Sequence, residues 1–277
     1  MFDTICYYFL LFFIYSFLGW IIETIVCSYH EKKLILNRGF LIGPYIPIYG
    51  TAGVLMVLFL SEYKRDPVLL FCMAVIYSSL LEYVTSYLME KIFKARWWDY
   101  SDHKFNLNGR ICLENCLLFG VLGVILIYII NPGVTFVLDI LPSVLFYTLA
   151  IVFLTLMITD AIITLTVLAQ LNIKVNKYKG DATQKIEAEI SKVLKKYRVL
   201  YKRMFKAFPT FRFTTDNGSE ILKKVRESLD EVESYLNEKK EKIKEIRIKI
   251  KNLRRENANK DVIEKMKEEI KNIRKGR

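Results

Sequence analysis

Long apolar runs constrain this chain more than any other feature of its sequence. Five strongly hydrophobic segments are present, at 5–27, 43–60, 67–89, 111–130 and 141–171. An apolar helix of about 20 residues crosses a hydrocarbon core about 30 Å thick. The second segment is the shortest and opens on Pro44 and Pro47, so its start is predicted to be irregular; the fifth must tilt or kink. The predicted fold class is therefore all-α: a polytopic helical membrane bundle of about five transmembrane helices with a C-terminal tail.

Charge divides the chain into two predicted domains, a transmembrane helical domain at 1–171 and a basic cytoplasmic helical tail at 172–277. Of the 41 Lys and Arg residues, 31 lie in the tail, against 17 of the 29 Asp and Glu. Basic connections at 28–42 and 90–110 alternate with poorer ones at 61–66 and 131–140. Cytoplasmic loops carry the excess of Lys and Arg. We therefore expect a multi-pass protein of the cytoplasmic membrane, with its N-terminus outside and its tail in the cytoplasm.

The tail has the pattern of a coiled coil or helical hairpin. Apolar residues recur at spacings of four and three over 182–208 and at heptad spacing over 219–256, with a helix breaker at 209–218. A register slip at 257–259 marks a skip or a turn. The two helices could pair within one chain, which we favour slightly, or the seam could join two chains. Residues 182–277 are thus a predicted site for a homo-oligomer or a partner protein.

The basic surplus of the tail has three interpretations. A solvated helical face is the simplest, and attraction to anionic headgroups of the lipid bilayer is the second. Binding to nucleic acid is the least supported, because the sequence contains no recognised nucleic-acid motif.

Four carboxylates within the apolar segments are candidate functional residues, because a carboxylate at bilayer depth costs a few kcal/mol or more. They are Glu23, Glu82, Glu114 and Asp160. Glu114 follows Arg110 by four residues, a spacing that permits a helical ion pair, whereas Asp160 has no obvious local partner. Two interpretations are nearly even: a polar pathway for a cation, a proton or a small polar substrate, and hydrogen bonding between helices.

An aromatic loop follows the third apolar segment. Arg96 and Asp99 are spaced to pair across one turn, on either side of Trp97 and Trp98. Paired Trp residues at a membrane boundary are usually interfacial anchors. The alternative is a binding loop that folds back toward the bundle.

Enzyme and metal chemistry have little support in the sequence. The five Cys and two His residues form no metal-ligand pattern. The P-loop, H-E-x-x-H, G-x-S-x-G and kinase motifs are all missing from the sequence. We therefore expect a protein that is not an enzyme, with no catalytic residues, no metal and no cofactor.

Several sequence blocks together resemble a bacterial membrane family, the putative ABC-transporter type IV family. The blocks are FLGWIIE at 17–23, NRGFLIGPY at 37–45, LEYVTSYLME at 81–90 and most of 95–114. The resemblance covers about residues 5–170 and leaves the tail outside. It implies a core site made of residues in these blocks: Glu23, Arg38, Glu82, Trp97, Trp98, Asp99, Asn108, Arg110 and Glu114. Asp160 joins them as a pathway candidate on physical grounds.

The family resemblance implies a permease-like subunit of a transport system and fixes no substrate. Any ATPase must then be a separate subunit, because this chain has no P-loop. The alternative is a membrane scaffold or sensor that does not transport and recruits a partner through its coiled-coil tail.

Overall fold

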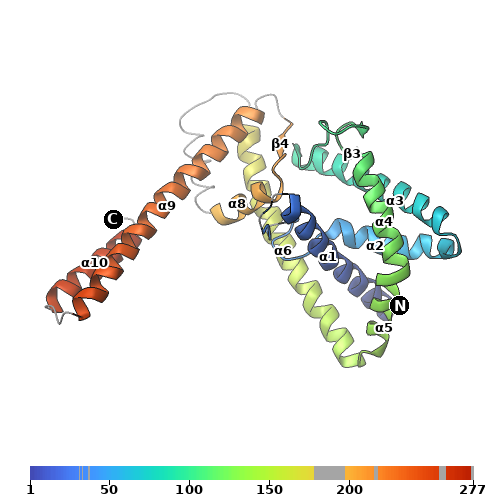
Figure 1. The fold of residues 1–277 in the computed structure, drawn as a ribbon, viewed down its shortest axis with the longest axis horizontal. Coiled ribbons are helices and arrows are strands. Elements are labelled where there is room, and N and C mark those ends of the chain that lie inside the picture. The colour runs from blue at the N-terminus through green and yellow to red at the C-terminus, as the bar shows by residue number, and fades with distance from the viewer. Residues whose placement is uncertain are drawn as a thin grey trace.

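The computed structural model describes residues 1–30, 32, 34–36, 38–177, 197–214, 218–255 and 260–275. Within these ranges the protein is mainly helical, with four strands of two residues each (Figure 1). The elements are α1 (Phe2–His30), α2 (Pro47–Leu60), η1 (Ser61–Arg65), α3 (Pro67–Phe93), β1 (Ala95–Arg96), β2 (Asn106–Leu107), β3 (Ile111–Cys112), α4 (Leu113–Ile125), η2 (Leu126–Ile130), α5 (Asn131–Ile140), α6 (Ser143–Lys177), α8 (Arg198–Ala207), β4 (Arg212–Phe213), α9 (Gly218–Arg255) and α10 (Lys260–Lys275).

The predicted helical membrane bundle is confirmed, with a correction to the number of long spans. In the described part of the chain, four helical stretches are long and apolar enough to cross a membrane: Phe2–Tyr29, Pro67–Phe93, Leu113–Ile140 and Ser143–Gln170. The predicted second span is shorter, because α2 begins at Pro47 and contains 14 residues. At 1.5 Å per residue it is about 21 Å long, less than the hydrocarbon thickness. Four long spans and one short helix therefore replace the five spans expected.

The fourth span continues where the sequence predicted a loop at 131–140. Residues Leu126–Ile130 form a π-helical turn, and α5 follows without a break. Pro132 lacks an N–H and its ring crowds the carbonyl four residues earlier, which lies in this turn. A π-turn changes the local hydrogen-bond pattern and lets the helix pass a proline. The connection to α6 is reduced to residues 141–142.

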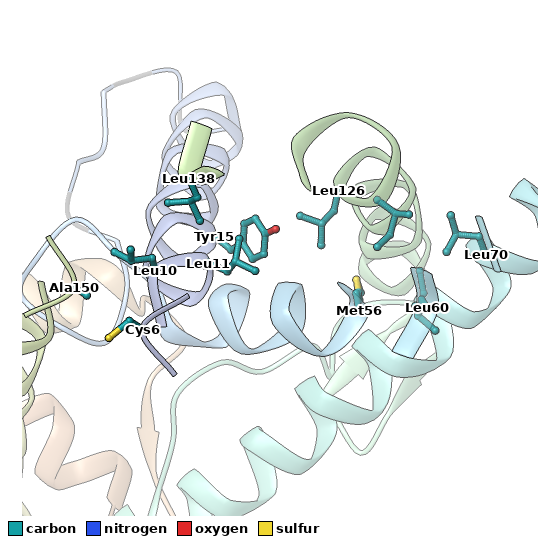
Figure 2. Close-up of a cluster of buried hydrophobic side chains, with 12 residues drawn as sticks. Cys6, Leu10, Leu11, Tyr15, Met56, Leu60, Leu70, Leu126, Leu138 and Ala150 are labelled. Carbon is teal, nitrogen blue, oxygen red and sulfur yellow. The ribbon is translucent and has the colours of Figure 1, made fainter. Parts of the chain in front are cut away.

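Side chains from all the apolar helices meet in one core (Figure 2). Helices α1 and α2 approach each other closely at Gly50 of α2. A Cβ atom there would lie 2.1 Å from Ser16 Oγ and 2.4 Å from the Phe12 carbonyl oxygen of α1. Such contacts between backbones are typical of helices packed in a membrane, where small residues replace the hydrophobic effect as the means of association. The Tyr15 hydroxyl also donates to Asn131 Oδ1 at 2.7 Å and thereby links α1 to α5.

One end of the bundle, which we call the loop end, gathers the two basic connections and the start of the tail. Arg38 donates from Nη1 to the Ala207 carbonyl at 2.8 Å, and Thr214 N donates to the Lys94 carbonyl at 2.9 Å. Strands β1 and β4 pair antiparallel, with Ala95 opposite Phe213. The loop end thus joins segments that are more than 100 residues apart in the sequence.

The tail packs partly on the bundle and partly on itself. Tyr201 of α8 is fully buried, and its hydroxyl donates to the Val167 carbonyl of α6 at 2.8 Å. Met204 of α8 lies in the same cluster as Val225 and Leu229 of α9. The far half of α9 packs instead on α10, through a second cluster that contains Ile246, Ile250 and Ile263.

The structure pairs α9 with α10, a hairpin that was not predicted. The predicted hairpin joined 182–208 to 219–256, and the described end of its first helix, α8, shares a cluster with α9. Most of the first predicted helix, and the register slip at 257–259, lie outside the described residues. A coiled coil between two chains stays a prediction.

Candidate functional site

A cavity of about 660 Å³ lies between α1, α2, α3 and α4 and reaches the loop end. Most of its lining is apolar. Among the described residues that line it, three have ionisable carboxyl or guanidinium groups: Glu23 of α1, Glu82 of α3 and Arg38 of the first connection. The cavity therefore brings together three of the residues that the sequence singled out.

Glu82 has one hydrogen-bond partner and one unpaired oxygen. Its side chain is on the inner face of α3 and 6% exposed. Oε1 accepts from the Tyr100 hydroxyl at 3.3 Å, whereas Oε2 is buried with no hydrogen-bond partner among the described residues. The hydroxyl of Ser78 bonds to the carbonyl of Ala74 on its own helix. A buried polar atom without a partner is costly, so the second oxygen of Glu82 is a buried, unsatisfied acceptor on a residue that lines the cavity.

Glu23 forms a second carboxylate–tyrosine pair. Its Oε2 accepts from the Tyr49 hydroxyl at 2.9 Å, and its Oε1 accepts from Cys27 Sγ at 3.5 Å. Tyr49 fits there because residue 19 is glycine: a Cβ at Gly19 would lie 2.3 Å from the Tyr49 Cβ. The absence of that one methyl group lets α2 bring its tyrosine to the carboxylate of α1.

Tyr100 lies near both carboxylates. Burial raises the pKa of its hydroxyl, and the charges of Glu82 and Glu23 raise it further. The phenol therefore keeps its proton and acts as a donor at neutral pH. Tyr100 comes from the aromatic loop, so this loop supplies one wall of the cavity.

Arg38 connects the cavity to the tail. Its side chain is 9% exposed, and its Nε is buried with no hydrogen-bond partner among the described residues. Its Nη1 donates to the Ala207 carbonyl at 2.8 Å. Arg203 of α8 in turn donates to the carbonyl oxygen of Arg38 at 3.2 Å and to that of Leu41. These reciprocal bonds hold the first connection against α8.

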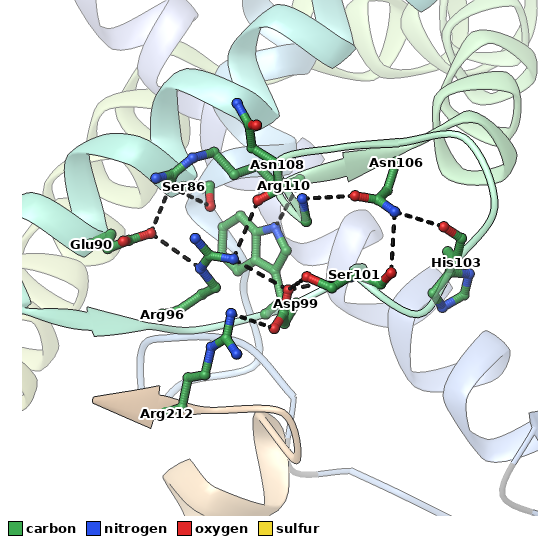
Figure 3. A network of polar contacts seen from close by, with 12 residues as sticks. Ser86, Glu90, Arg96, Asp99, Ser101, His103, Asn106, Asn108, Arg110 and Arg212 are labelled. Atoms are coloured by element: carbon green, nitrogen blue, oxygen red, sulfur yellow. Dashed lines mark hydrogen bonds and ion pairs between the residues drawn. The ribbon is translucent and has the colours of Figure 1, made fainter. Parts of the chain in front are cut away.

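A network of charged side chains supports the aromatic loop (Figure 3). Glu90 at the end of α3 accepts from two arginines, with 2.9 Å from Oε2 to Arg110 Nη1 and 3.2 Å to Arg96 Nε. The guanidinium of Arg110 also lies 5.7 Å from the ring centroid of Tyr83 and 5.5 Å from that of Tyr87. Glu90 thus neutralises buried charge at both ends of the loop.

Asp99 joins the aromatic loop to the tail. Its Oδ1 is 3.3 Å from Arg96 Nη1, and its Oδ2 is 2.7 Å from Arg212 Nη2 on β4. Burial on its own would raise the pKa of the Asp99 carboxyl, but the hydrogen bonds from Ser101 and the charges of Arg212 and Arg96 hold it below its usual value. The carboxylate is therefore ionised at neutral pH and holds β4 in place.

Asn108 and Gly109 shape the return of the loop. Asn108 has a φ of 54° and donates from Nδ2 to the Tyr83 hydroxyl at 2.9 Å. Gly109 has a φ of 67°, and a Cβ there would lie 2.4 Å from Asp99 Oδ1. Left-handed backbone suits glycine and is tolerated by asparagine, so the Asn-Gly pair is required for the turn. Asn108 therefore has a local structural role outside the cavity.

The two tryptophans are not interfacial anchors, and the loop folds back onto the bundle. Trp97 is 3% exposed and lies in an aromatic cluster with ring centroids 5.0 Å from Phe40 and 5.1 Å from Phe208. Trp98 lines the cavity and donates from Nε1 to the Arg110 carbonyl at 3.1 Å. Both indoles are thus part of the interior.

Asp160 is a clamp on the first connection and does not line the cavity. Its carboxylate accepts from Ile42 N at 2.9 Å, Gly43 N at 2.7 Å, the Tyr45 hydroxyl at 2.7 Å and Thr164 Oγ1 at 3.0 Å. The sequence offered no obvious local partner for Asp160. The structure gives it one partner in its own helix, Thr164, and three partners in segment 42–45. Hydrogen bonding between segments is the interpretation that the structure supports here.

Glu114 does not form the predicted ion pair with Arg110. Its side chain is 81% exposed and its Oε2 lies 3.8 Å from Nδ1 of His103. Arg110 pairs instead with Glu90, which comes from a different helix and is better buried. Glu114 is therefore separate from the cavity.

Sequence reasoning missed several residues that complete the site. Glu90 and Tyr100 lie within the blocks that carry the family resemblance, so the blocks contained a signal for them. Tyr49 had a weaker one, since a phenol in an apolar segment needs a polar partner. Phe208 and Arg212 had none, because they reach the site only through the fold of the tail.

A family described as "Putative ABC-transporter type IV" matches residues 10–165, which include the aromatic loop and all of the cavity lining except residues 207–210, and exclude the tail. No curated protein and no solved structure matches the chain.

Proposed function

The chain belongs to the putative ABC-transporter type IV family, and from this premise we propose that it is the membrane subunit of a transport system with its substrate site in the cavity beside Glu23 and Glu82. The observation that carries the proposal is Glu82, a buried carboxylate that lines the cavity and whose Oε2 has no hydrogen-bond partner among the described residues. Ionisable residues kept within membrane helices mark substrate or ion pathways. The cavity also has a volume in the range of small-molecule sites, about 300–1,000 Å³.

The energy source in this proposal is a separate ATP-binding subunit. The sequence lacks a G-x-x-x-x-G-K-[ST] motif, so the chain supplies no P-loop. An ATPase works in the cytoplasm and has to contact the membrane subunit on that side. The loop end and the tail are the natural contact region, since their basic segments are expected to face the cytoplasm.

Topology can be tested by cysteine accessibility. Glu62→Cys in η1 should react with a membrane-impermeant maleimide in intact cells, and Lys104→Cys in the aromatic loop should react only after permeabilisation. The physical reason is the excess of Lys and Arg at the loop end. The unsubstituted chain gives the background labelling. The reverse pattern would place the tail outside the cytoplasm and contradict the proposal.

Co-purification and a search for transported compounds test the function. Full-length tagged protein purified from native membranes should carry an ATP-binding chain in stoichiometric amount, detected by mass spectrometry. In cells that lack the gene, restoring it should change the level of one or a few small molecules by about tenfold, the effect of about 1.4 kcal/mol of differential free energy. Glu82→Gln should abolish that change, because it removes the charge in the cavity and keeps the shape.

A matched variant controls for the substitution itself. Glu62→Gln makes the same chemical change at an exposed residue of η1 that does not line the cavity, and should behave as the unsubstituted protein. If no ATP-binding chain co-purifies and no compound responds to Glu82, the transport proposal is wrong.

A scaffold that recruits a partner is the second candidate function. It is favoured by the α9–α10 hairpin, which has its own apolar cluster and projects away from the bundle (Figure 1). Deleting residues 240–277 removes most of this hairpin and spares Val225 and Leu229 in the cluster with α8. A scaffold should lose its partner on this deletion and tolerate Glu82→Gln, whereas a transporter should show the opposite dependence on Glu82.

A further inference from the structure

We propose that the cavity selects amphiphilic organic cations, molecules that carry one positive charge on an aromatic or aliphatic body. The inference rests on the proposed function, because it assigns a substrate class to the same cavity. Three observations support it: the charge balance of the lining, the unpaired oxygen of Glu82 and the aromatic side chains beside the two carboxylates.

When both carboxylates are ionised, the lining carries one negative charge in excess. Glu23 and Glu82 are the carboxylates, and Arg38 is the single cation among the described lining residues. Nη1 of Arg38 donates to the Ala207 carbonyl, and no carboxylate of the described chain lies within ion-pair distance of the Arg38 guanidinium. Buried charges require a partner in a poorly hydrated interior. One positive charge on a ligand would balance the cavity.

Glu82 provides the point of attachment. Tyr100 satisfies Oε1, and Oε2 has no partner among the described residues although the side chain is 94% buried. A cationic N–H group would gain a charge-assisted hydrogen bond there, and these bonds are roughly twice as strong as neutral ones. A quaternary cation would gain the Coulombic attraction alone.

Aromatic side chains line the same cavity. Trp98, Tyr100, Tyr49 and Phe119 all line the cavity, and the rings of Tyr49 and Phe119 pack edge to face with centroids 5.9 Å apart. The faces of aromatic rings attract organic cations, by about 0.5–2 kcal/mol for each favourable contact. The same rings offer apolar area to the body of the ligand, which a hydrophilic cation could not use.

Other ligand classes fit the cavity less well. A metal ion would need a cluster of ligands, and the described residues contain no group of three or more His, Cys, Asp or Glu able to hold one. An anion could accept a hydrogen bond from Arg38 Nε, which has no partner among the described residues, but it would be repelled by the two carboxylates when they are ionised. A neutral apolar molecule would leave Oε2 of Glu82 without a partner. An organic cation satisfies the charge, the open acceptor and the apolar walls together.

A pair of ions with the same shape and opposite charge tests the proposal. Full-length protein in lipid nanodiscs is titrated with tetraphenylphosphonium and, separately, with tetraphenylborate, and binding is followed by calorimetry against empty nanodiscs. Tetraphenylphosphonium should bind saturably, with about one site per chain and at least tenfold tighter than tetraphenylborate. Glu82→Gln should weaken this binding at least tenfold, and Glu62→Gln should leave it unchanged.

Glu23→Gln provides a second variant in case Glu82→Gln melts at a lower temperature than the unsubstituted protein. Equal affinity for the two ions, no saturable binding of the cation, or unchanged binding in both glutamine variants would overturn the proposal. A compound that depends on Glu82 in cells and is not cationic would also overturn it and would leave the transport function standing. Cation binding without any ATP-binding partner or change in cell content would support the ligand class and refute the transport function.

Discussion

Asp160→Ala should destabilise the folded protein by about 3–5 kcal/mol, because it removes the acceptor of four buried or partly buried hydrogen bonds, each worth about 1.5–3 kcal/mol when one partner is charged. Two of the donors are the backbone N–H groups of Ile42 and Gly43, which would lose their acceptor. The first connection carries Arg38, so its release should also loosen the contact with α8. The measurement is unfolding of the full chain in detergent, followed by circular dichroism.

Thr164→Val is the matched control for Asp160→Ala. It removes one of the four bonds and leaves the carboxylate with the other three, so the expected loss is about 1 kcal/mol. If both variants unfold at the same denaturant concentration, the clamp assigned to Asp160 does not exist. Asp160→Asn should fall between the two, because its amide keeps one oxygen acceptor and turns an NH₂ group toward donors.

Trp97→Ala should cost about 3–5 kcal/mol, the range seen when a buried Trp or Phe is truncated in a packed core. Its ring joins three segments, with centroids 5.7 Å from Phe93 on α3, 5.0 Å from Phe40 on the first connection and 5.2 Å from Phe211 on the tail. Losing the indole should detach β4, and trypsin should then cleave after Arg212 at least tenfold faster. Limited proteolysis with mass spectrometry measures this rate.

Two further variants test whether the effect of Trp97→Ala comes from the loss of a packed ring. Trp97→Phe should be milder than alanine, because it keeps most of the ring and removes an indole N–H that is buried with no hydrogen-bond partner among the described residues. Phe105→Ala removes an aromatic ring that is 81% exposed, and a surface change of this kind should stay within about 0.5 kcal/mol. Rapid cleavage in the Phe105 variant would show that the proteolysis does not report on the cluster.

The apolar runs were sufficient to predict a helical membrane bundle because the length of a span is fixed by the thickness of the bilayer. The prolines of the second segment predicted its irregular start, and α2 begins at Pro47. The prediction failed at Pro132, which lies inside the fourth span where a loop was expected. The first proline shortens a helix, and the second is accommodated by a π-turn that leaves no clear mark on hydropathy.

The sequence predicted which carboxylates are candidates for the site but not which groups they contact. A carboxylate in an apolar segment requires a polar partner or water. This rule identified Glu23, Glu82 and Asp160 as candidates. The partner itself has no signal when it is a backbone N–H more than 100 residues away, as Ile42 is for Asp160. Two-residue strands such as β4 are likewise too short to show a period.

Segment 207–213 contributes both to the lining of the cavity and to the pairing of β4 with β1. Ala207 and Phe208 line the cavity, and four residues later the same segment pairs with β1 and leads into α9. A protein that binds α9 and draws β4 away from β1 would therefore reshape the wall of the cavity. Thermodynamic linkage makes this coupling reciprocal. If the partner protein weakens the binding of a ligand in the cavity tenfold, the ligand weakens the binding of the partner protein tenfold as well.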